Sequence, residues 1–251
     1  MPDPTGTLVI LRHGQSTWNL SNRFTGWHDV PLTPQGEAEA VAAGRTMADA
    51  GLRFDIAHTS VLARAVMTNH LALQEMGQVW LPVLRHWRLN ERHYGALQGL
   101  DKKETAERHG AEQTHLWRRS FDVPPPPVAE DDPRHPAGDR RYRLLPPDVL
   151  PATECLKDVV ARVLPYWHDV VAPQLLAGMD VLVTAHGNSL RGLLMHLEHV
   201  PAEEIPAVNI PTGVPRRYRL DDRLAVQEAE YLGDADAIAA AADAVARQTG
   251  G

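Results

Sequence analysis

Two segments, 8-LVILRHGQSTWN-19 and 181-VLVTAHGNS-189, decide the fold that this sequence predicts. Each is an apolar run that ends in a histidine followed by glycine. A short apolar run bounded by glycine is typical of a buried strand, and open α/β sheets bind their ligands just outside the carboxyl ends of such strands. We therefore expect His13 and His186 to meet in one crevice, although they lie far apart in the sequence.

Helix and strand signals alternate after the first run. Thr33, followed by proline, has the pattern of a helix N-cap, and Gly51 has the pattern of a C-terminal stop. The segment FDIAHTS then indicates a second strand, which leads into a helix capped by Ser60 and ending near Gly77. Such alternation is typical of βαβ units. The sequence therefore predicts a three-layer α/β/α fold, with a mainly parallel sheet and helices on both of its faces.

The middle of the chain departs from this alternation. We expect a third strand over Val79 to Leu84, and then a helix that starts at Asp101 and Glu104, which have capping-box spacing. From residue 124 the sequence PPPP is followed by acidic, basic and proline residues with little periodicity. Long irregular insertions are usually either functional or disordered. Because this one contains aromatic and basic residues, we predict an irregular lid insertion over residues 92–152 rather than a linker.

The α/β pattern returns in the last third of the chain. Apolar residues from Leu156 to Trp167 share one helical face, and Pro165 should bend that helix. Val181–Ala185 then form the last core strand, and the string NIPTGVPRRYRL indicates a turn that leads to an edge strand. The alanine-rich end, residues 233–251, is predicted to be a flexible tail.

The composition limits the partners and the compartment. The 251 residues, 43% of them hydrophobic, can bury a substantial core, and we expect one domain over residues 1–251. A formal charge of −7 argues against broad attraction to nucleic acid or to an anionic membrane. The single cysteine, Cys155, excludes an intrachain disulfide, and the sequence starts without an export or membrane segment. We therefore expect a cytoplasmic protein that binds anions through local Arg and Lys.

His13 is the candidate nucleophile. It follows Arg12 directly, and a cation so close disfavours protonation of the ring, which keeps a lone pair available for attack on phosphorus. An isolated histidine after a strand is more often a buried ring satisfied by backbone groups. Here, however, Arg12, Asn19, Thr25 and Gly26 supply planar, amide, hydroxyl and backbone donors, which suit the oxygens of a phosphoryl group in transfer.

Further charged residues could complete a phosphoryl-transfer site. Arg64 lies one turn into the helix after the second predicted strand, so its guanidinium could reach the same crevice and bind phosphate in a bidentate manner. Glu91, in the polar string NERHYGALQGL, could exchange a proton with a substrate hydroxyl, although most glutamates are simply solvated. Lys102, Arg118 and Arg119 form a second basic group, whose alternative interpretation is a charged helix face.

The chain resembles the 2,3-bisphosphoglycerate-dependent phosphoglycerate mutases of the histidine phosphatase superfamily. The resemblance covers nearly the whole length and rests on strings that occur in the family's order: LRHGQSTWN, FTGW, SVLARAV, NERHYGALQGLDK, WRRSFDVPPPP, LKDVVARVLPYW, AHGNSLRGL and NIPTGVP. It implies that His13 is phosphorylated, that Arg12, Arg64 and His186 bind the phosphoryl group, and that Glu91 is the acid or base. Gln15, where the family usually has Glu, and Cys155, where Ser is common, depart from the pattern.

The same resemblance implies a substrate, a cofactor and an assembly. The reaction would interconvert 3-phosphoglycerate and 2-phosphoglycerate in glycolysis and gluconeogenesis, with 2,3-bisphosphoglycerate as the priming phosphoryl donor and without a metal ion. Phosphoglycerates would be the partners, and the chain would form a homo-oligomer, either a dimer or a tetramer. The residues implied to line the substrate site, besides those that grip the phosphoryl group, are Asn19, Thr25, Gly26, Tyr94, Lys102, Arg118, Arg119, Gly187 and Asn188.

Four other interpretations bear on this site. A phosphatase of the same superfamily would pass the phosphoryl group from His13 to water, but the second basic group and the long insertion favour a mutase. A phospholigand-binding protein without catalysis would not need the nucleophile and Glu91 together. A serine hydrolase is disfavoured because the string around Ser189, GNSLRG, lacks G-x-S-x-G spacing. His196 and His199 could lie on one helical face as metal ligands, but metal sites generally need further ligands.

Overall fold

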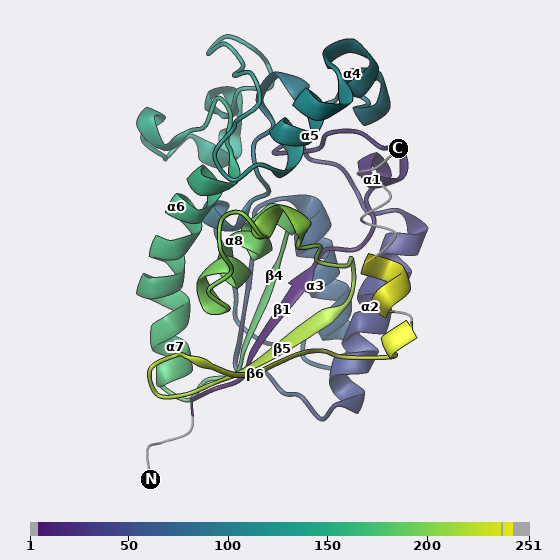
Figure 1. Ribbon diagram of the computed structural model, residues 1–251. Coiled ribbons are helices and arrows are strands. Elements are labelled where there is room, and N and C mark those ends of the chain that lie inside the picture. Colours follow the sequence, from purple (N-terminus) through teal and green to yellow (C-terminus); the bar gives the residue numbers. More distant parts are fainter. Residues whose placement is uncertain (1–4, 237, 243–251) are drawn as a thin grey trace.

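The computed structural model describes residues 5–236 and 238–242, and within these residues six strands form a single sheet (Figure 1). The strands are β1 (Leu8–Arg12), β2 (Ile56–Thr59), β3 (Val83–Arg85), β4 (Val181–Ala185), β5 (Pro215–Leu220) and β6 (Val226–Tyr231). Their order is β3-β2-β4-β1-β5-β6, with parallel pairing from β3 to β1 and antiparallel pairing from β1 to β6. The mainly parallel sheet is therefore confirmed.

β1 and β4 are neighbours at the centre of the sheet, although most of the chain separates them in sequence. Leu8 pairs with Val181, and the ladder continues to Arg12 and Ala185. Because the two strands are parallel and end together, the residues that follow them lie at the same edge of the sheet. The N–H of His13 donates to the carbonyl of Ala185 at 3.0 Å. This ladder is the physical reason that the two His-Gly segments meet.

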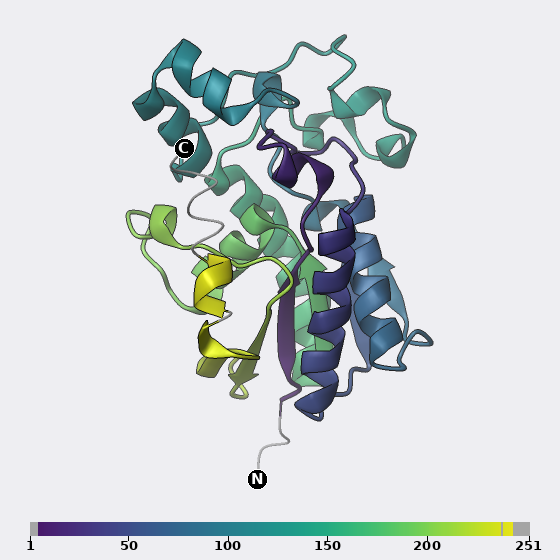
Figure 2. The ribbon, with the colours of Figure 1, turned by 90° about the vertical axis from the view of Figure 1, so that its right-hand side faces the viewer.

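Helices cover both faces of the sheet, which confirms the three-layer arrangement (Figures 1 and 2). One face carries α2 (Pro34–Asp49) and α3 (Ala63–Glu75), and the other carries α6 (Leu156–Tyr166), α7 (Ala172–Leu176) and α8 (Gly187–Leu197). Side chains of β1 alternate between the two cores: Val9 and Leu11 pack on the first face, Leu8 and Ile10 on the second. Each such side chain contributes roughly 1.5 to 3 kcal/mol when fully buried.

The helix caps agree only in part with the predictions. Thr33 caps α2, since its Oγ1 accepts the N–H of Gly36 at 3.0 Å, and Gly51 has a φ of +72° just after the helix. The predicted cap at Ser60 is wrong, because α3 begins at Ala63 and Leu62 is its N-cap. The Ser60 hydroxyl instead accepts the N–H of Leu62 and contacts a ring nitrogen of His186, which directly follows the neighbouring strand β4.

Two strand predictions also need correction. The third strand covers only Val83–Arg85, because residues 78–81 form a turn in which the N–H of Leu81 donates to the carbonyl of Gln78. The string NIPTGVPRRYRL does lead into β5, but β5 is not an edge strand, since it pairs with both β1 and β6. The edge strand on this side of the sheet is β6, whose sequence VQEAEY is largely polar and gives a weak periodic signal.

Residues 92–152 form a folded layer above the carboxyl ends of the strands, at the top of Figures 1 and 2. The layer contains α4 (Lys102–His109), α5 (Ala111–Arg119) and short 3-10 helices between residues 136 and 149. Asp101 caps α4 as predicted, because its Oδ1 accepts the N–H groups of Lys103 and Glu104. Tyr142 anchors the irregular part: it is 2% exposed, its hydroxyl accepts from Asn90 Nδ2 at 2.9 Å, and its ring packs on Trp27.

α6 does not end at Pro165 but continues through a π-helical segment, Trp167–Val171, into α7. Proline lacks the N–H that a regular helix would use at this position, and the ladder changes register just after it.

Of the predicted tail, residues 235, 236 and 238–242 are helical, while residues 237 and 243–251 lie outside the described residues. No helix in the described part of the chain has the length and apolarity that crossing a membrane would require.

Candidate active site

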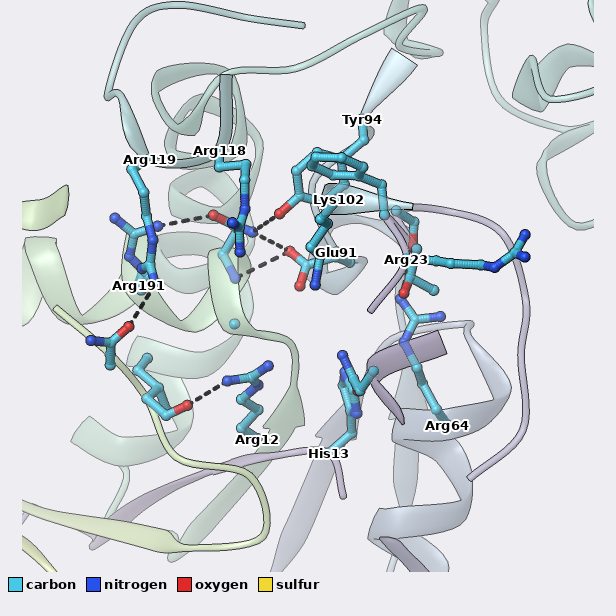
Figure 3. A pocket seen from close by; sticks show the side chains of 18 of the residues that line it. Arg12, His13, Arg23, Arg64, Glu91, Tyr94, Lys102, Arg118, Arg119 and Arg191 are labelled. Carbon is cyan, nitrogen blue, oxygen red and sulfur yellow. Dashed lines mark hydrogen bonds between the residues drawn. The ribbon is translucent and has the colours of Figure 1, made fainter. Parts of the chain in front are cut away.

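A pocket opens where β1 and β4 end, beneath the layer formed by residues 92–152 (Figure 3). Its lining includes every site residue predicted from the sequence except His186, which lies against His13 instead. Among the described residues, seven cationic side chains and one carboxylate, Glu91, line it. The cations are Arg12, Arg23, Arg64, Lys102, Arg118, Arg119 and Arg191. Such an excess of positive charge in a chain of net charge −7 marks an anion site.

The rings of His13 and His186 stand edge to face, with their centroids 4.9 Å apart. Both are buried, at 3% and 0% exposure. His13 directly follows β1, and His186 is the N-cap residue of α8 directly after β4. The meeting of the two imidazoles that the sequence predicts is therefore present in the structure.

The surroundings of His13 fix its protonation state. Its Nδ1 lies 2.7 Å from the carbonyl of Gly14, and a carbonyl only accepts, so Nδ1 carries the proton and Nε2 keeps its lone pair. Burial, reinforced by the cations of Arg64 and Arg12, lowers the pKa of His13 well below its usual value. A neutral imidazole with a free Nε2 lone pair is a competent nucleophile.

Arg12 and Arg64 flank His13 in Figure 3. Nη1 of Arg12 donates to the carbonyl of Ile210 at 2.7 Å, while its buried Nε has no partner in the described part of the protein. Arg64, on the first turn of α3, donates to the carbonyls of Gly26 at 2.8 Å and His28 at 3.1 Å. Burial lowers the pKa of Arg64 to about 10, opposed by the nearby Glu91, so it remains a cation at neutral pH. The two guanidiniums are thus held in place before any anion binds.

Glu91 lies between the two sides of the pocket in Figure 3 and is 8% exposed. Its Oε1 accepts from the N–H of Arg92 at 2.7 Å, and from the backbone N–H and Nδ2 of Asn188 at 3.1 and 2.9 Å. In the described residues every hydrogen bond to this side chain ends on Oε1. The carboxylate is therefore rigidly placed, and Oε2 is the oxygen that can exchange a proton with a ligand.

The loop after β1 forms another wall of the pocket. Asn19 belongs to α1 (Thr17–Leu20), and its Oδ1 accepts from the backbone N–H of Ser16, which leaves Nδ2 as a donor. Thr25 and Gly26 follow on the same loop, and Gly26 has a φ of +59°. A Cβ at Gly26 would collide with the side chain of Gln98, whose Oε1 accepts the N–H of Trp27 at 2.7 Å. Only glycine therefore fits at this point of the wall.

The second basic group comes from the layer over the sheet. Lys102 is the first residue of α4, and Arg118 and Arg119 are the last two of α5. Burial, together with the cations of Arg118 and Arg12, lowers the pKa of Lys102 to about 7. Arg119 donates to Oδ1 of Asn209 at 2.8 Å. An anion bound here would raise the affinity of Lys102 for its proton, so binding and protonation are coupled.

Several pocket residues were not predicted from the sequence. Arg191, one turn after Asn188 on α8, donates to Asn188 Oδ1 at 3.1 Å, and its Nε is buried without a partner among the described residues. The spacing of three between Asn188 and Arg191 in GNSLRG was the available signal. The remaining unpredicted lining residues are Arg23, Phe24, Val208, Asn209 and Ile210.

His196, which was considered together with His199 as a metal ligand, packs against other aromatic rings. The ring of His196 packs against His168, with centroids 5.1 Å apart, and against Trp167. Within residues 5–236 and 238–242 no three His, Cys, Asp or Glu side chains are grouped so that they could hold a metal ion. The pocket itself is lined by guanidinium, amide and imidazole groups, which can stabilise negative charge on a ligand.

Comparison with known proteins gives both a family and named relatives. The sequence profile of the histidine phosphatase superfamily (branch 1) matches residues 8–135 and 128–224. A 2,3-bisphosphoglycerate-dependent phosphoglycerate mutase of Nitratidesulfovibrio vulgaris strain Miyazaki F is 63% identical over 242 residues, which are 96% of this chain and 97% of that protein. The enzyme of the same name from strain Hildenborough is 60% identical over 241 residues, 96% of each chain.

Solved structures share the fold at lower identity. A mycobacterial hydrolase superposes with a TM-score of 0.70 at 23% identity, covering 92% of this chain and all (100%) of its own. A mycobacterial glucosyl-3-phosphoglycerate phosphatase superposes with a TM-score of 0.67 at 24% identity, covering 90% of this chain and 97% of its own. The sheet and its helices are therefore an arrangement that other solved proteins also adopt.

Proposed function

This chain belongs to the histidine phosphatase superfamily, and from that premise we propose that it is a 2,3-bisphosphoglycerate-dependent phosphoglycerate mutase. It interconverts 3-phosphoglycerate and 2-phosphoglycerate through a phosphohistidine, which makes it an isomerase of glycolysis and gluconeogenesis. The observation that carries the proposal is the buried pair His13 and His186, 4.9 Å apart, with a second basic group across the same pocket. Two relatives with this name, at 63% and 60% identity, support it.

His13 carries the phosphoryl group in the proposed reaction. The bond from Nε2 to phosphorus forms as the bond from phosphorus to the donor's ester oxygen breaks, and that oxygen takes a proton from Glu91. Arg12, Arg64 and His186 stabilise the charge on the phosphoryl oxygens during both transfers. Glu91 then accepts the proton of the other hydroxyl when the phosphoryl group returns, so its proton balance closes over a full cycle.

The pocket fits a bisphosphorylated ligand. Three buried side-chain nitrogens, Arg12 Nε, His186 Nδ1 and Arg191 Nε, have no hydrogen-bond partner among the described residues, as expected of groups that await an anion. When bound, 2,3-bisphosphoglycerate supplies the phosphoryl group that first charges His13.

Two basic groups on opposite sides explain isomerisation. Arg12, Arg64 and His186 bind one phosphate, while Lys102, Arg118 and Arg119 bind the other anionic end. If one group bound its phosphate much more strongly than the other, the ligand would stay in a single orientation. Two groups of similar strength therefore favour exchange of the two ends of the ligand between them. We further propose that residues 92–152 act as a lid that carries the second group and excludes water from the phosphohistidine.

A phosphatase is the second candidate, because the similar solved structures include a glucosyl-3-phosphoglycerate phosphatase. A phosphatase needs water as the acceptor, whereas the second basic group and the layer above the pocket favour a retained sugar-acid substrate. The test measures conversion of 3-phosphoglycerate in a coupled assay beside release of free phosphate. Free phosphate as the main product would replace the mutase by the phosphatase.

Replacement of the nucleophile tests the proposal directly. In His13→Ala we expect both the acid-labile phosphoenzyme, measured by intact mass after incubation with 2,3-bisphosphoglycerate, and isomerisation to disappear together. His70→Ala, which removes an exposed imidazole of α3, is the matched control and should retain both. Isomerisation by the His13→Ala protein would overturn the proposal.

We propose a cytoplasmic homo-oligomer, a dimer or a tetramer, by analogy with the family that the sequence resembles. The buried, unpaired thiol of Cys155 is compatible with a reducing compartment. Light scattering after gel filtration measures the mass directly, and a value near the 27.7 kDa of one chain would contradict the oligomer.

A further inference from the structure

We propose that Ser60 is a positioning residue that fixes the tautomer of His186, so that this ring, while neutral, donates its Nδ1–H to the phosphoryl group. The acceptor in this statement rests on the proposed function, whereas the tautomer is a property of the free protein. No motif in the sequence suggests this role, since Ser60 lies 126 positions before His186.

Ser60 and His186 contact each other in a fully buried setting. Ser60 follows β2, both residues are 0% exposed, and Ser60 Oγ lies 2.7 Å from His186 Nε2. The same Oγ accepts the N–H of Leu62 at 3.1 Å. A hydroxyl has one proton to donate, and the described residues offer this one no acceptor other than Nε2. The arrangement that satisfies every group has Ser60 donating to an unprotonated Nε2.

The proton of the neutral ring then sits on Nδ1. This atom is buried and has no hydrogen-bond partner in the described part of the chain. In the opposite tautomer, the buried proton of the Ser60 hydroxyl would lack an acceptor among the described residues. Buried polar groups are rarely left in that state, so the hydrogen bonding selects Nδ1–H.

The two histidines thus share a tautomer but use it in opposite ways. His13 commits its Nδ1–H to the carbonyl of Gly14 and keeps Nε2 for bond formation. His186 commits Nε2 to Ser60 and keeps Nδ1–H for a phosphoryl oxygen. A doubly protonated His186 is not available for this purpose, because burial and the cation of Arg64 lower the pKa of its ring well below the usual value.

Both ends of the contact are held by other groups. The N–H of Val61 donates to Asn90 Oδ1 at 3.2 Å, which fixes the segment after β2. The backbone N–H of His186 donates to Ser189 Oγ at 3.1 Å at the start of α8. Loss of the Ser60 hydroxyl therefore leaves the ring in place but removes what chooses its tautomer.

The experiment compares the wild type, Ser60→Ala and Thr59→Val. Thr59 is the neighbouring residue, also 0% exposed, and its hydroxyl has no hydrogen-bond partner among the described residues, so Thr59→Val removes a buried hydroxyl without touching His186. Nitrogen-15 spectra of histidine-labelled protein report which ring nitrogen of His186 is protonated. Quenched-flow mass measurement gives the rate at which His13 acquires a phosphoryl group from 2,3-bisphosphoglycerate.

We expect Nδ1–H for His186 in the wild type and in Thr59→Val, and a mixture of tautomers in Ser60→Ala. Phosphorylation of His13 should slow about 10- to 100-fold in Ser60→Ala, somewhat less than the loss of a whole oxyanion donor, and should be unchanged in Thr59→Val. Ser60→Cys, whose thiol donates weakly, should give an intermediate rate. It also replaces Ser60→Ala if that variant does not fold.

Two results would overturn the proposal: an Nε2–H tautomer of His186 in the wild type, or wild-type phosphorylation in a folded Ser60→Ala. Wild-type protein that shows the Nδ1–H tautomer but never becomes phosphorylated would instead contradict the proposed mutase function, and the assignment of Ser60 to the tautomer would stand. The spectrum and the kinetic measurement thus separate the two failures.

Discussion

One carboxylate oxygen of Glu91, Oε1, accepts hydrogen bonds from the protein, and the other, Oε2, is available to a ligand. Glu91→Gln keeps the shape and an acceptor for Arg92 and Asn188, but an amide cannot exchange a proton in the same way. We expect turnover to fall about 100- to 10,000-fold, with little change in KM, in a coupled assay of 3-phosphoglycerate conversion. Glu37→Gln, on the exposed side of α2, is the control. Turnover close to wild type would remove Glu91 from the role of proton shuttle.

Residues whose role follows from their sequence neighbours were predicted, whereas Ser60 and Arg191, whose roles depend on distant partners, were not. Arg12 and His13 are adjacent, so their electrostatic coupling follows from the string itself. Ser60 matches an N-cap pattern equally well, and only the β2–β4 pairing shows that its partner is His186. Arg191 shares this limit, because its importance depends on the packing of α8 beside the pocket.

The residue that caps α4 directly precedes a lysine of the proposed substrate site, so the stability of this helix should affect substrate binding. Asp101 caps this helix, and the next residue, Lys102, belongs to the second basic group. Asp101→Ala should lower the free energy of unfolding by about 1 kcal/mol and raise KM for phosphoglycerate several-fold, with kcat less affected. Asp101→Asn, which retains a capping acceptor, separates the cap from the charge and should stay near wild type in urea unfolding. Equal effects of both substitutions would indicate that the charge matters and the cap does not.

The irregular half of the proposed lid depends on one buried contact. Tyr142 lies against Trp27, and its hydroxyl accepts from Asn90 Nδ2. Tyr142→Phe retains the ring packing but leaves a buried amide donor without its partner, at a cost of about 1 to 3 kcal/mol. We expect faster amide hydrogen exchange across residues 128–150, with the strands unaffected. Exchange that is unchanged there would show that Tyr142 does not hold the segment.

Elements with strong internal signals were predicted well, and elements defined by their partners were not. The strands β1 and β4 and the cap of α2 follow from local sequence, because apolar runs and capping residues act within a few positions. The limits of β3 and the existence of β6 depend on where a neighbouring strand offers hydrogen bonds. The path of residues 124–151 depends likewise on the surface that Trp27 and Asn90 provide.

At the scale of the whole molecule, buried histidines make folding dependent on pH. Burial lowers the pKa of His93 from 6.5 to about 4, and Nδ1 of this ring accepts the N–H of Gly95, a bond that protonation would break. The unfolded chain therefore binds more protons than the folded one below pH 6.5. Stability is fully present above that pH and is lost as the pH falls towards 4. His93 alone accounts for roughly 3 kcal/mol, since a tenfold change in an equilibrium constant corresponds to about 1.4 kcal/mol.

Urea unfolding at a series of pH values measures this dependence. The free energy of unfolding should decline between pH 6.5 and 4, and the decline should be smaller in His93→Asn, which does not titrate. His70→Asn, at an exposed position of α3, is the matched control. A slope that is the same in His93→Asn and the wild type would contradict the assignment.

The ladder between β1 and β4 has a consequence for how this architecture can vary. The two imidazoles are aligned by five consecutive backbone pairings, from Leu8 with Val181 to Arg12 with Ala185, and the chain between these strands leaves the ladder uninterrupted. Surface segments such as residues 124–151 can therefore be replaced, by evolution or by engineering, so that the pocket binds other substrates while the nucleophile stays in place. A one-residue deletion within β4, by contrast, would turn successive side chains to the opposite face of the sheet. The two imidazoles would then no longer be aligned, and activity would be lost.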